Sequence, residues 1–109
     1  MLKAIFGSEK KGKILLYIYT HREAYPTEMA KAFKFYLNTV QNQLLAMERD
    51  GILYSQLRGK VRLFGLNPRY PFKEELEMLL EKILDFIPQR ERETYYMPRL
   101  RPRRTGKPL

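Results

Sequence analysis

The chain has 109 residues, of which 21 are Lys or Arg and 12 are Asp or Glu, so its formal net charge at pH 7 is +9. That length supports one compact domain with a tail but not two full domains, and the charge favours a polyanionic partner such as nucleic acid. The sequence has no Cys and one His, His21. This excludes disulfides, thiolate metal sites, cysteine nucleophiles and a multi-histidine metal cage. We therefore expect a basic binding domain without a metal or other cofactor.

No segment of the sequence has the character of a membrane anchor. The longest apolar run, residues 14–19, is six residues long, whereas a spanning helix needs about 20. The first residues also lack the apolar stretch of a signal peptide. We expect a soluble, cytoplasmic protein without a membrane partner.

The charge is distributed unevenly along the chain. Residues 1–71 hold twelve basic and five acidic residues, a net charge of +7. Residues 72–87 hold two basic and five acidic residues, a net charge of −3, and residues 88–109 hold seven and two, a net charge of +5. Two basic blocks are thus separated by an acidic segment.

The first half of the chain has the pattern of three helices. Ser8 is a candidate N-cap, and the apolar residues that follow it recur at helical spacing, which predicts a helix over 8–21. Thr27, directly after a Pro, is the expected cap of a short second helix. A third helix is predicted over 36–50, because Leu37, Val40, Leu44 and Met47 fall on one face of it.

The second half of the chain predicts a hairpin, a helix and a tail. Residues 52–57 and 61–66 are β-prone runs on either side of a basic tip, Arg-Gly-Lys. Residues 72–87 combine an apolar stripe with glutamates, which we expect to be solvated rather than an acid–base pair. Residues 88–109 contain four prolines and are expected to be extended.

Three helices followed by a basic-tipped hairpin and an amphipathic helix resemble the ArsR/MarR-like winged helix-turn-helix transcriptional regulators. The resemblance rests on Ala30, Val40 and Leu44, on residues 47–53 (Met-Glu-Arg-Asp-Gly-Ile-Leu), and on residues 58–68 through the wing. It covers about residues 1–87. It implies a mainly α fold with a small β-hairpin (α+β), a winged helix-turn-helix to which a C-terminal helix and a basic extended tail are added.

Two positions depart from the pattern of that family. Lys34 stands where a glycine often makes the turn, and Tyr36 stands where Ser or Thr usually caps the recognition helix. Since the sequence has no Cys or His cluster, metal sensing of the ArsR kind is not implied.

The polar side of the predicted helix 36–50 is suited to reading DNA. Asn and Gln amides can pair bidentately with adenine in the major groove, and a good pair discriminates by about 1–3 kcal/mol. Cations at the hairpin tip and before the helix can hold phosphates of the backbone or minor groove. The predicted DNA-binding residues are Lys31, Lys34, Tyr36, Asn38, Thr39, Gln41, Asn42, Arg58, Lys60 and Arg62.

The apolar stripe of residues 72–87 is wider than one small domain readily hides. In the resembling family, terminal helices pair two subunits, which implies a homodimer matched to palindromic half-sites. The alternative is that this helix packs on the first helix within a monomer. The predicted dimerisation residues are Leu2, Ile5, Phe6, Leu76, Leu79, Leu80, Ile83, Leu84 and Ile87.

These observations predict a sequence-specific double-stranded DNA-binding transcriptional regulator, with a winged-helix domain at 1–87 and a basic tail at 88–109. An enzyme is disfavoured because no nucleophile–base, metal or phosphate-loop constellation is present. Two alternatives stay open: a winged-helix protein-interaction module whose tail binds a partner protein, and an RNA-binding protein. The tail residues expected to contact a protein or nucleic acid are Arg99, Arg101, Arg103 and Arg104.

Overall fold

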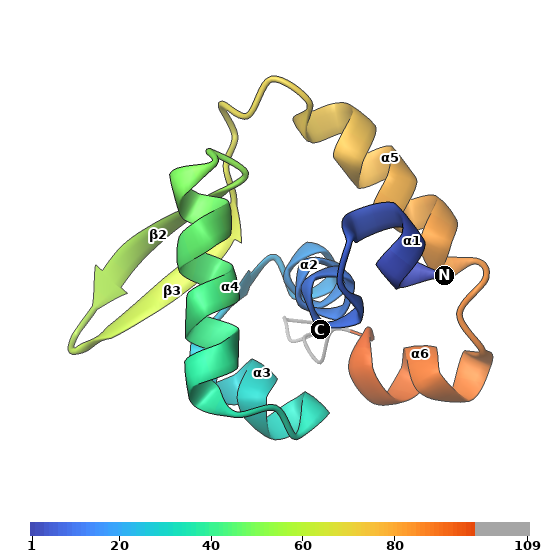
Figure 1. Cartoon of the computed structure of the whole chain (residues 1–109), viewed down its shortest axis with the longest axis horizontal. Helices are drawn as coiled ribbons and strands as arrows, with labels where there is room; N and C mark the ends of the chain where they lie inside the picture. Colours follow the sequence, from blue (N-terminus) through green and yellow to red (C-terminus); the bar gives the residue numbers. More distant parts are fainter. Residues whose placement is uncertain (98–109) are drawn as a thin grey trace, which may run out of the picture.

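The computed structural model describes residues 1–97, in which helices pack around a central helix and a small antiparallel sheet lies at one edge of the domain (Figure 1). The helices are α1 (Leu2–Phe6), α2 (Glu9–His21), α3 (Pro26–Phe33), α4 (Leu37–Arg49), α5 (Lys73–Leu84) and α6 (Gln89–Tyr95). The strands are β1 (Glu23–Ala24), β2 (Leu53–Arg58) and β3 (Val61–Leu66), in the order β1-β3-β2. The predicted mainly helical winged-helix fold is confirmed. No helix of residues 1–97 has the length and apolar character needed to cross a membrane.

Helix α2 is the centre of the domain (Figure 1). It begins as predicted at Ser8, whose side-chain oxygen accepts a hydrogen bond from the Lys11 N–H at 3.2 Å. Ile14, Leu16 and Ile18 are completely buried, because α2 contacts α1, α4, α5 and the sheet. A helix surrounded in this way needs apolar residues on most of its circumference, which explains the continuous apolar run.

Helix α1, which the sequence patterns did not predict, packs on α2 at a glycine. A Cβ atom on Gly12 would lie 2.8 Å from the Leu2 Cβ and 3.0 Å from the Phe6 ring. The absent side chain therefore permits the close approach of the two helices, although glycine weakens a helix interior by about 1 kcal/mol relative to alanine.

Helices α3 and α4 form the helix-turn-helix. Glu28 accepts a hydrogen bond from the Tyr25 N–H at 2.8 Å, so α3 begins at Pro26 and the predicted cap at Thr27 is wrong. A proline at the first position of a helix is favourable because it has no N–H to leave unpaired. Lys34 takes the left-handed conformation (φ 59°) in the turn before α4, at the position where the family often has glycine.

Strands β2 and β3 form the predicted hairpin, with a turn at Gly59 (φ 65°). Strand β1 was missed because two residues are too short to show a periodic pattern. Gly65 on β3 lies between the two outer strands, where a Cβ would stand 2.7 Å from the Tyr54 ring. The ring of Tyr54 thus crosses β3 to donate a hydrogen bond to Glu23 on β1 at 2.6 Å.

The C-terminal part differs from the prediction. Residues 88–109 were expected to be extended, but Gln89–Tyr95 form helix α6, so the prediction is wrong for these residues. Pro88 stands directly before α6, where its fixed φ does not disturb a helix. Tyr96 and Ile87 both lie in the core of the domain, on either side of the predicted domain boundary. The four tail arginines lie outside the described residues.

Candidate nucleic-acid interface

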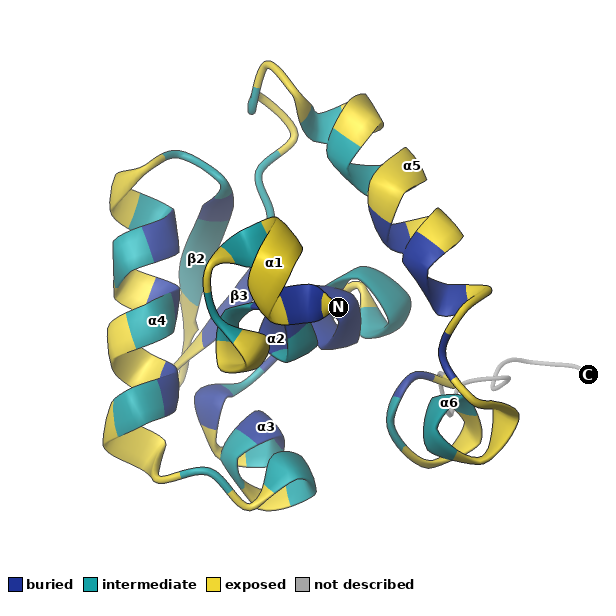
Figure 2. Ribbon diagram, turned by 45° about the vertical axis from the view of Figure 1, so that its right-hand side comes forward, coloured by how far each residue is buried: buried dark blue, intermediate teal, exposed yellow. Residues whose placement is uncertain are grey.

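One side of helix α4 is buried and the other is exposed (Figure 2). Val40, Leu44 and Met47 are at most 1% exposed, as the periodicity predicted, whereas Leu37 at the first position is 39% exposed. Of the predicted base-reading residues on this helix, Asn38, Gln41 and Asn42 are exposed and Thr39 is half-buried. Within residues 1–97 the three exposed amides have no hydrogen-bond partner in the chain, so their donors and acceptors are available.

The exposed side of α4 continues into a groove that we call the α4–wing groove. It has a volume of about 420 Å³ and is bounded by the N-terminus of α3, by α4 and by strand β3. It brings Gln41 and Asn42 of α4 together with Lys60 and Arg62 of the hairpin, although the two pairs are distant in sequence. The groove-lining residues are Tyr25, Pro26, Thr27, Gln41, Asn42, Leu45, Lys60, Val61, Arg62 and Phe64.

The five predicted cations are all exposed, and two of them, Lys60 and Arg62, line this groove. Lys31 is on α3, Lys34 is in the turn, and the remaining three are on the hairpin. Arg62 donates a hydrogen bond from Nη1 to the Ser55 hydroxyl at 3.1 Å, which orients it on the strand. Among residues 1–97 none of these five cations forms an ion pair, so their charge is not neutralised within the described chain. Tyr36, at the N-cap of α4, is 85% exposed and makes no side-chain cap bond.

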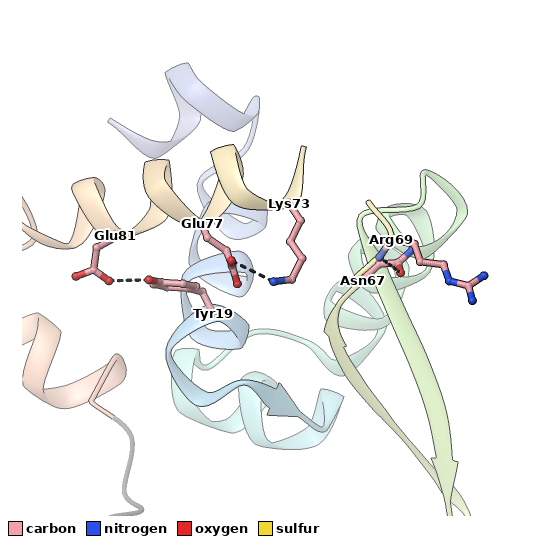
Figure 3. A network of polar contacts seen from close by, with 6 residues as sticks. All are labelled: Tyr19, Asn67, Arg69, Lys73, Glu77 and Glu81. Atoms are coloured by element: carbon pink, nitrogen blue, oxygen red, sulfur yellow. Dashed lines mark hydrogen bonds and ion pairs between the residues drawn. The ribbon is translucent and has the colours of Figure 1, made fainter. Parts of the chain in front are cut away.

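A second hollow, the α2–α5 cleft, has a volume of about 850 Å³ and lies between α2, the sheet and α5. Figure 3 shows Tyr19 donating a hydrogen bond to Glu81 at 2.7 Å, beside an ion pair of Lys73 and Glu77 at 3.1 Å. Burial, followed by the hydrogen bond to Glu81, raises the pKa of Tyr19 to about 12. Two of the glutamates expected to be merely solvated are therefore bonded to other side chains.

The α2–α5 cleft is a poor place for a polyanion. Glu23, Glu77 and Glu81 line it against two cations, Arg22 and Lys73. Sequence reasoning missed this cleft because its lining comes from five separate elements and no single segment carries a pattern. Among residues 1–97 no cluster of His, Cys, Asp or Glu could hold a metal ion.

The predicted dimerisation residues fall into three groups. Five of them are core residues of the single chain, at most 8% exposed, which is the packing that the monomer alternative describes. They are Leu2, Leu80, Ile83, Leu84 and Ile87. Phe6 and Leu76 are half-buried, whereas Ile5 and Leu79 are 44% and 38% exposed. Met78 and Phe86, which the prediction did not include, are 72% and 67% exposed.

The architecture is similar to that of solved winged helix-turn-helix regulators of the MarR family. The apo form of a double mutant of ZitR from Lactococcus lactis matches with a TM-score of 0.55 at 16% identity, over 78% of this chain and 67% of that chain. The adhesin competence repressor AdcR from Streptococcus pyogenes matches with a TM-score of 0.55 at 18% identity, over 86% and 73%. No protein-family model and no curated protein matches the sequence. At these identities the similarity establishes the fold: the chain has the winged-helix architecture of MarR-family regulators, and the neighbours are MarR-like rather than ArsR-like.

Proposed function

We propose that this chain is a cytoplasmic, sequence-specific regulator of transcription that binds double-stranded DNA. The observation that carries this proposal is the α4–wing groove, which unites the amides Gln41 and Asn42 with the cations Lys60 and Arg62. Amides serve to read base edges, and cations serve to hold phosphates. A groove that presents both kinds of group on one surface has what a duplex-binding protein needs.

In this proposal the N-terminal half of α4 enters the major groove, and the β2–β3 wing contacts the adjacent backbone or minor groove. The major groove of B-form DNA is about 12 Å wide and admits a helix. The major groove of A-form RNA is too narrow for side chains to read. The placement of the amides on an exposed helix therefore favours DNA over duplex RNA.

The proposal separates two roles that substitution can test. Removing the wing cations with Arg58→Ala, Lys60→Ala and Arg62→Ala should weaken binding to all duplexes alike. It should also flatten the slope of log affinity against log salt by about 3, or 0.9 for each lost phosphate contact. Gln41→Ala with Asn42→Ala should instead lower the preference for a selected duplex over a random one by roughly 10- to 100-fold.

The measurement is fluorescence anisotropy of labelled duplexes between 50 and ~300 mM salt, after selection of a target from random duplexes. Arg69→Ala is the matched control, since it removes an exposed cation that lies between β3 and α5, outside the α4–wing groove. The proposal is contradicted if Arg69→Ala weakens binding as much as a wing substitution does. Preferred binding of duplex RNA in competition would favour the RNA-binding alternative instead.

We also propose that two chains pair through the exposed side of α5. Met78 and Leu79 are adjacent and exposed there, and Glu75 and Lys82 stand three positions before and after them. If two copies of α5 cross antiparallel with Met78 and Leu79 at the centre, Glu75 of each copy faces Lys82 of the other. A twofold pair thus buries apolar surface and matches opposite charges.

Sedimentation equilibrium of the full chain tests this pairing. Met78→Glu should raise the dimer dissociation constant at least about tenfold, because it places a carboxylate in the apolar centre. Leu57→Glu is the matched control, since Leu57 is 61% exposed on the wing, away from α5. A wild-type chain that keeps the mass of a monomer at all concentrations would show that the pairing is wrong.

A further inference from the structure

The exposed side of α4 has a composition that selects among base pairs. At 100° per residue, Asn38, Gln41, Asn42 and Leu45 fall within one continuous sector on the exposed side of the helix, and Leu37 lies at the edge of this sector, next to the buried face. We call these five residues the reading strip. Three of them carry amides, two carry branched apolar side chains, and none carries a charge.

The absence of cations from the reading strip matters because guanine is read chiefly by cations. Arg and Lys pair with guanine O6 and N7, whereas Asn and Gln pair with adenine N6 and N7. The next cation in this sector is Arg49, the last residue of α4. It lies eleven residues beyond Asn38, about 17 Å further along the axis at 1.5 Å per residue. The basic residues around the strip are on the wing and on α3, where they flank the helix.

The apolar members of the strip lie in water in the free protein. Leu37 is 39% exposed and Leu45 is 45% exposed, and Leu45 lines the α4–wing groove beside Gln41. In the major groove, the apolar group that such side chains can contact is the methyl group of thymine. The amides of the strip therefore favour adenine and its apolar residues favour thymine, and these are the two bases of one A·T pair.

We propose that α4 reads A·T base pairs, with the amides of the reading strip on adenine and with Leu45 on a thymine methyl. This inference rests on the proposed function, because it requires that α4 enters the major groove. The inference specifies the class of DNA sequence that the proposed site binds.

Selection of the full chain on random duplexes, followed by two substitutions within the selected site, tests the inference. The enriched positions should be A·T pairs. Replacing thymine by deoxyuridine removes the methyl group and should weaken binding about fourfold for each contacted base. Replacing adenine by 7-deazaadenine removes N7 and should weaken binding by roughly the five- to tenfold expected for one lost hydrogen bond to the base.

Two variants assign these effects to residues. Leu45→Ala should remove the sensitivity to deoxyuridine and keep the sensitivity to 7-deazaadenine, because the amides are unchanged. Gln41→Arg should shift the selected base at one position from adenine to guanine. Both side chains are exposed, so neither change removes core packing.

The outcomes distinguish a failure of the A·T inference from a failure of the proposed DNA-binding function. Tight, salt-dependent binding with enrichment of G·C pairs, or with no response to either modified base, overturns the A·T inference and leaves the DNA-binding function standing. Failure of the wild-type chain to bind any duplex removes the proposed function and the inference with it.

Discussion

The α4–wing groove and the α2–α5 cleft share one sheet but use their charges in opposite ways. Around the groove, cations such as Lys60 have no acidic partner within the described chain. In the cleft, carboxylates accept hydrogen bonds from other side chains: Glu81 from Tyr19 at 2.7 Å, and Glu23 from Tyr54 at 2.6 Å. Charges that are bonded internally stabilise the domain, whereas charges left unpaired on a surface are available to an external polyanion. The difference supports the proposal that the groove, rather than the cleft, is the surface that binds nucleic acid.

The largest expected effect comes from Tyr96, which joins the segment after α6 to the α2–α5 cleft. Its side chain is 2% exposed, and among the described residues its hydroxyl is the buried side-chain polar atom without a hydrogen-bond partner. Tyr96→Ala should lower the free energy of unfolding by about 3–5 kcal/mol, because it empties a large core position. Urea denaturation followed by circular dichroism measures this loss.

Tyr96→Phe is the informative partner of that change. It keeps the ring and removes a buried hydroxyl that has no partner, so stability should rise by about 1 kcal/mol. DNA affinity of the folded protein should be unchanged in both variants, since Tyr96 lines the cleft and not the groove. A loss of stability in Tyr96→Phe would show that the hydroxyl has a partner in solution.

The next effect concerns Gly65, where the cleft and the wing meet. Gly65→Ala places a Cβ 2.7 Å from the Tyr54 ring, which must move away from Glu23. Overpacking of this kind costs about 1–3 kcal/mol. Tyr54→Phe, which removes the hydrogen bond without a clash, should cost about 1 kcal/mol. Equal losses in the two variants, again by urea denaturation, would contradict the steric explanation.

These two sites show what the sequence could and could not predict. Periodicity placed α2 and α4 to within one or two residues, because each has an apolar face against the core, and the two β-prone runs placed the β2–β3 hairpin equally well. It missed β1 and α6, since a two-residue strand and a seven-residue helix after a proline are stabilised by distant contacts. Gly65 and Tyr96 acquire their roles from such contacts, which no local pattern contains.

The candidate site could also be predicted only in part from the sequence. The amides of α4 and the cations of the wing were predicted because a known order of elements assigns them a surface, and the structure places Gln41, Asn42, Lys60 and Arg62 in one groove. The apolar stripe of α5 was ambiguous, because a core and a subunit interface use the same residue types. Only the burial of Leu80 and the exposure of Met78 distinguish the two uses.

A smaller effect should appear as a pH dependence of stability in the cleft. Tyr19 has a pKa of about 12 in the folded chain instead of 10, mainly through burial and then through Glu81. Its stabilising contribution is complete below pH 10. It is lost as the pH rises from 10 toward 12, because the unfolded chain releases the proton first. Since the ring is partly exposed, the loss should be about 1 kcal/mol rather than the full value of the shift.

Tyr19→Phe isolates this contribution from the other tyrosines. The difference in free energy of unfolding between the wild type and Tyr19→Phe, measured from pH 8 to ~11.5, should shrink as the pH rises. A difference that stays constant over this range would mean that Tyr19 ionises alike in both states. DNA binding is not expected to follow this titration, because Tyr19 lies outside the groove.

The smallest effects should come from removing one lysine on each surface. Lys73 forms an i,i+4 pair with Glu77 at 3.1 Å, so Lys73→Ala should lower stability by about 0.3–0.5 kcal/mol and leave DNA affinity unchanged. Lys60→Ala removes the same charge from the wing, where within the described residues no acid pairs with it. It should leave stability unchanged and weaken DNA binding about fivefold at 0.15 M salt, the effect of one lost phosphate contact. Thermal unfolding and anisotropy on both variants provide the two readouts. If the two lysines affected both quantities equally, the division of charge between the groove and the cleft would have no functional meaning.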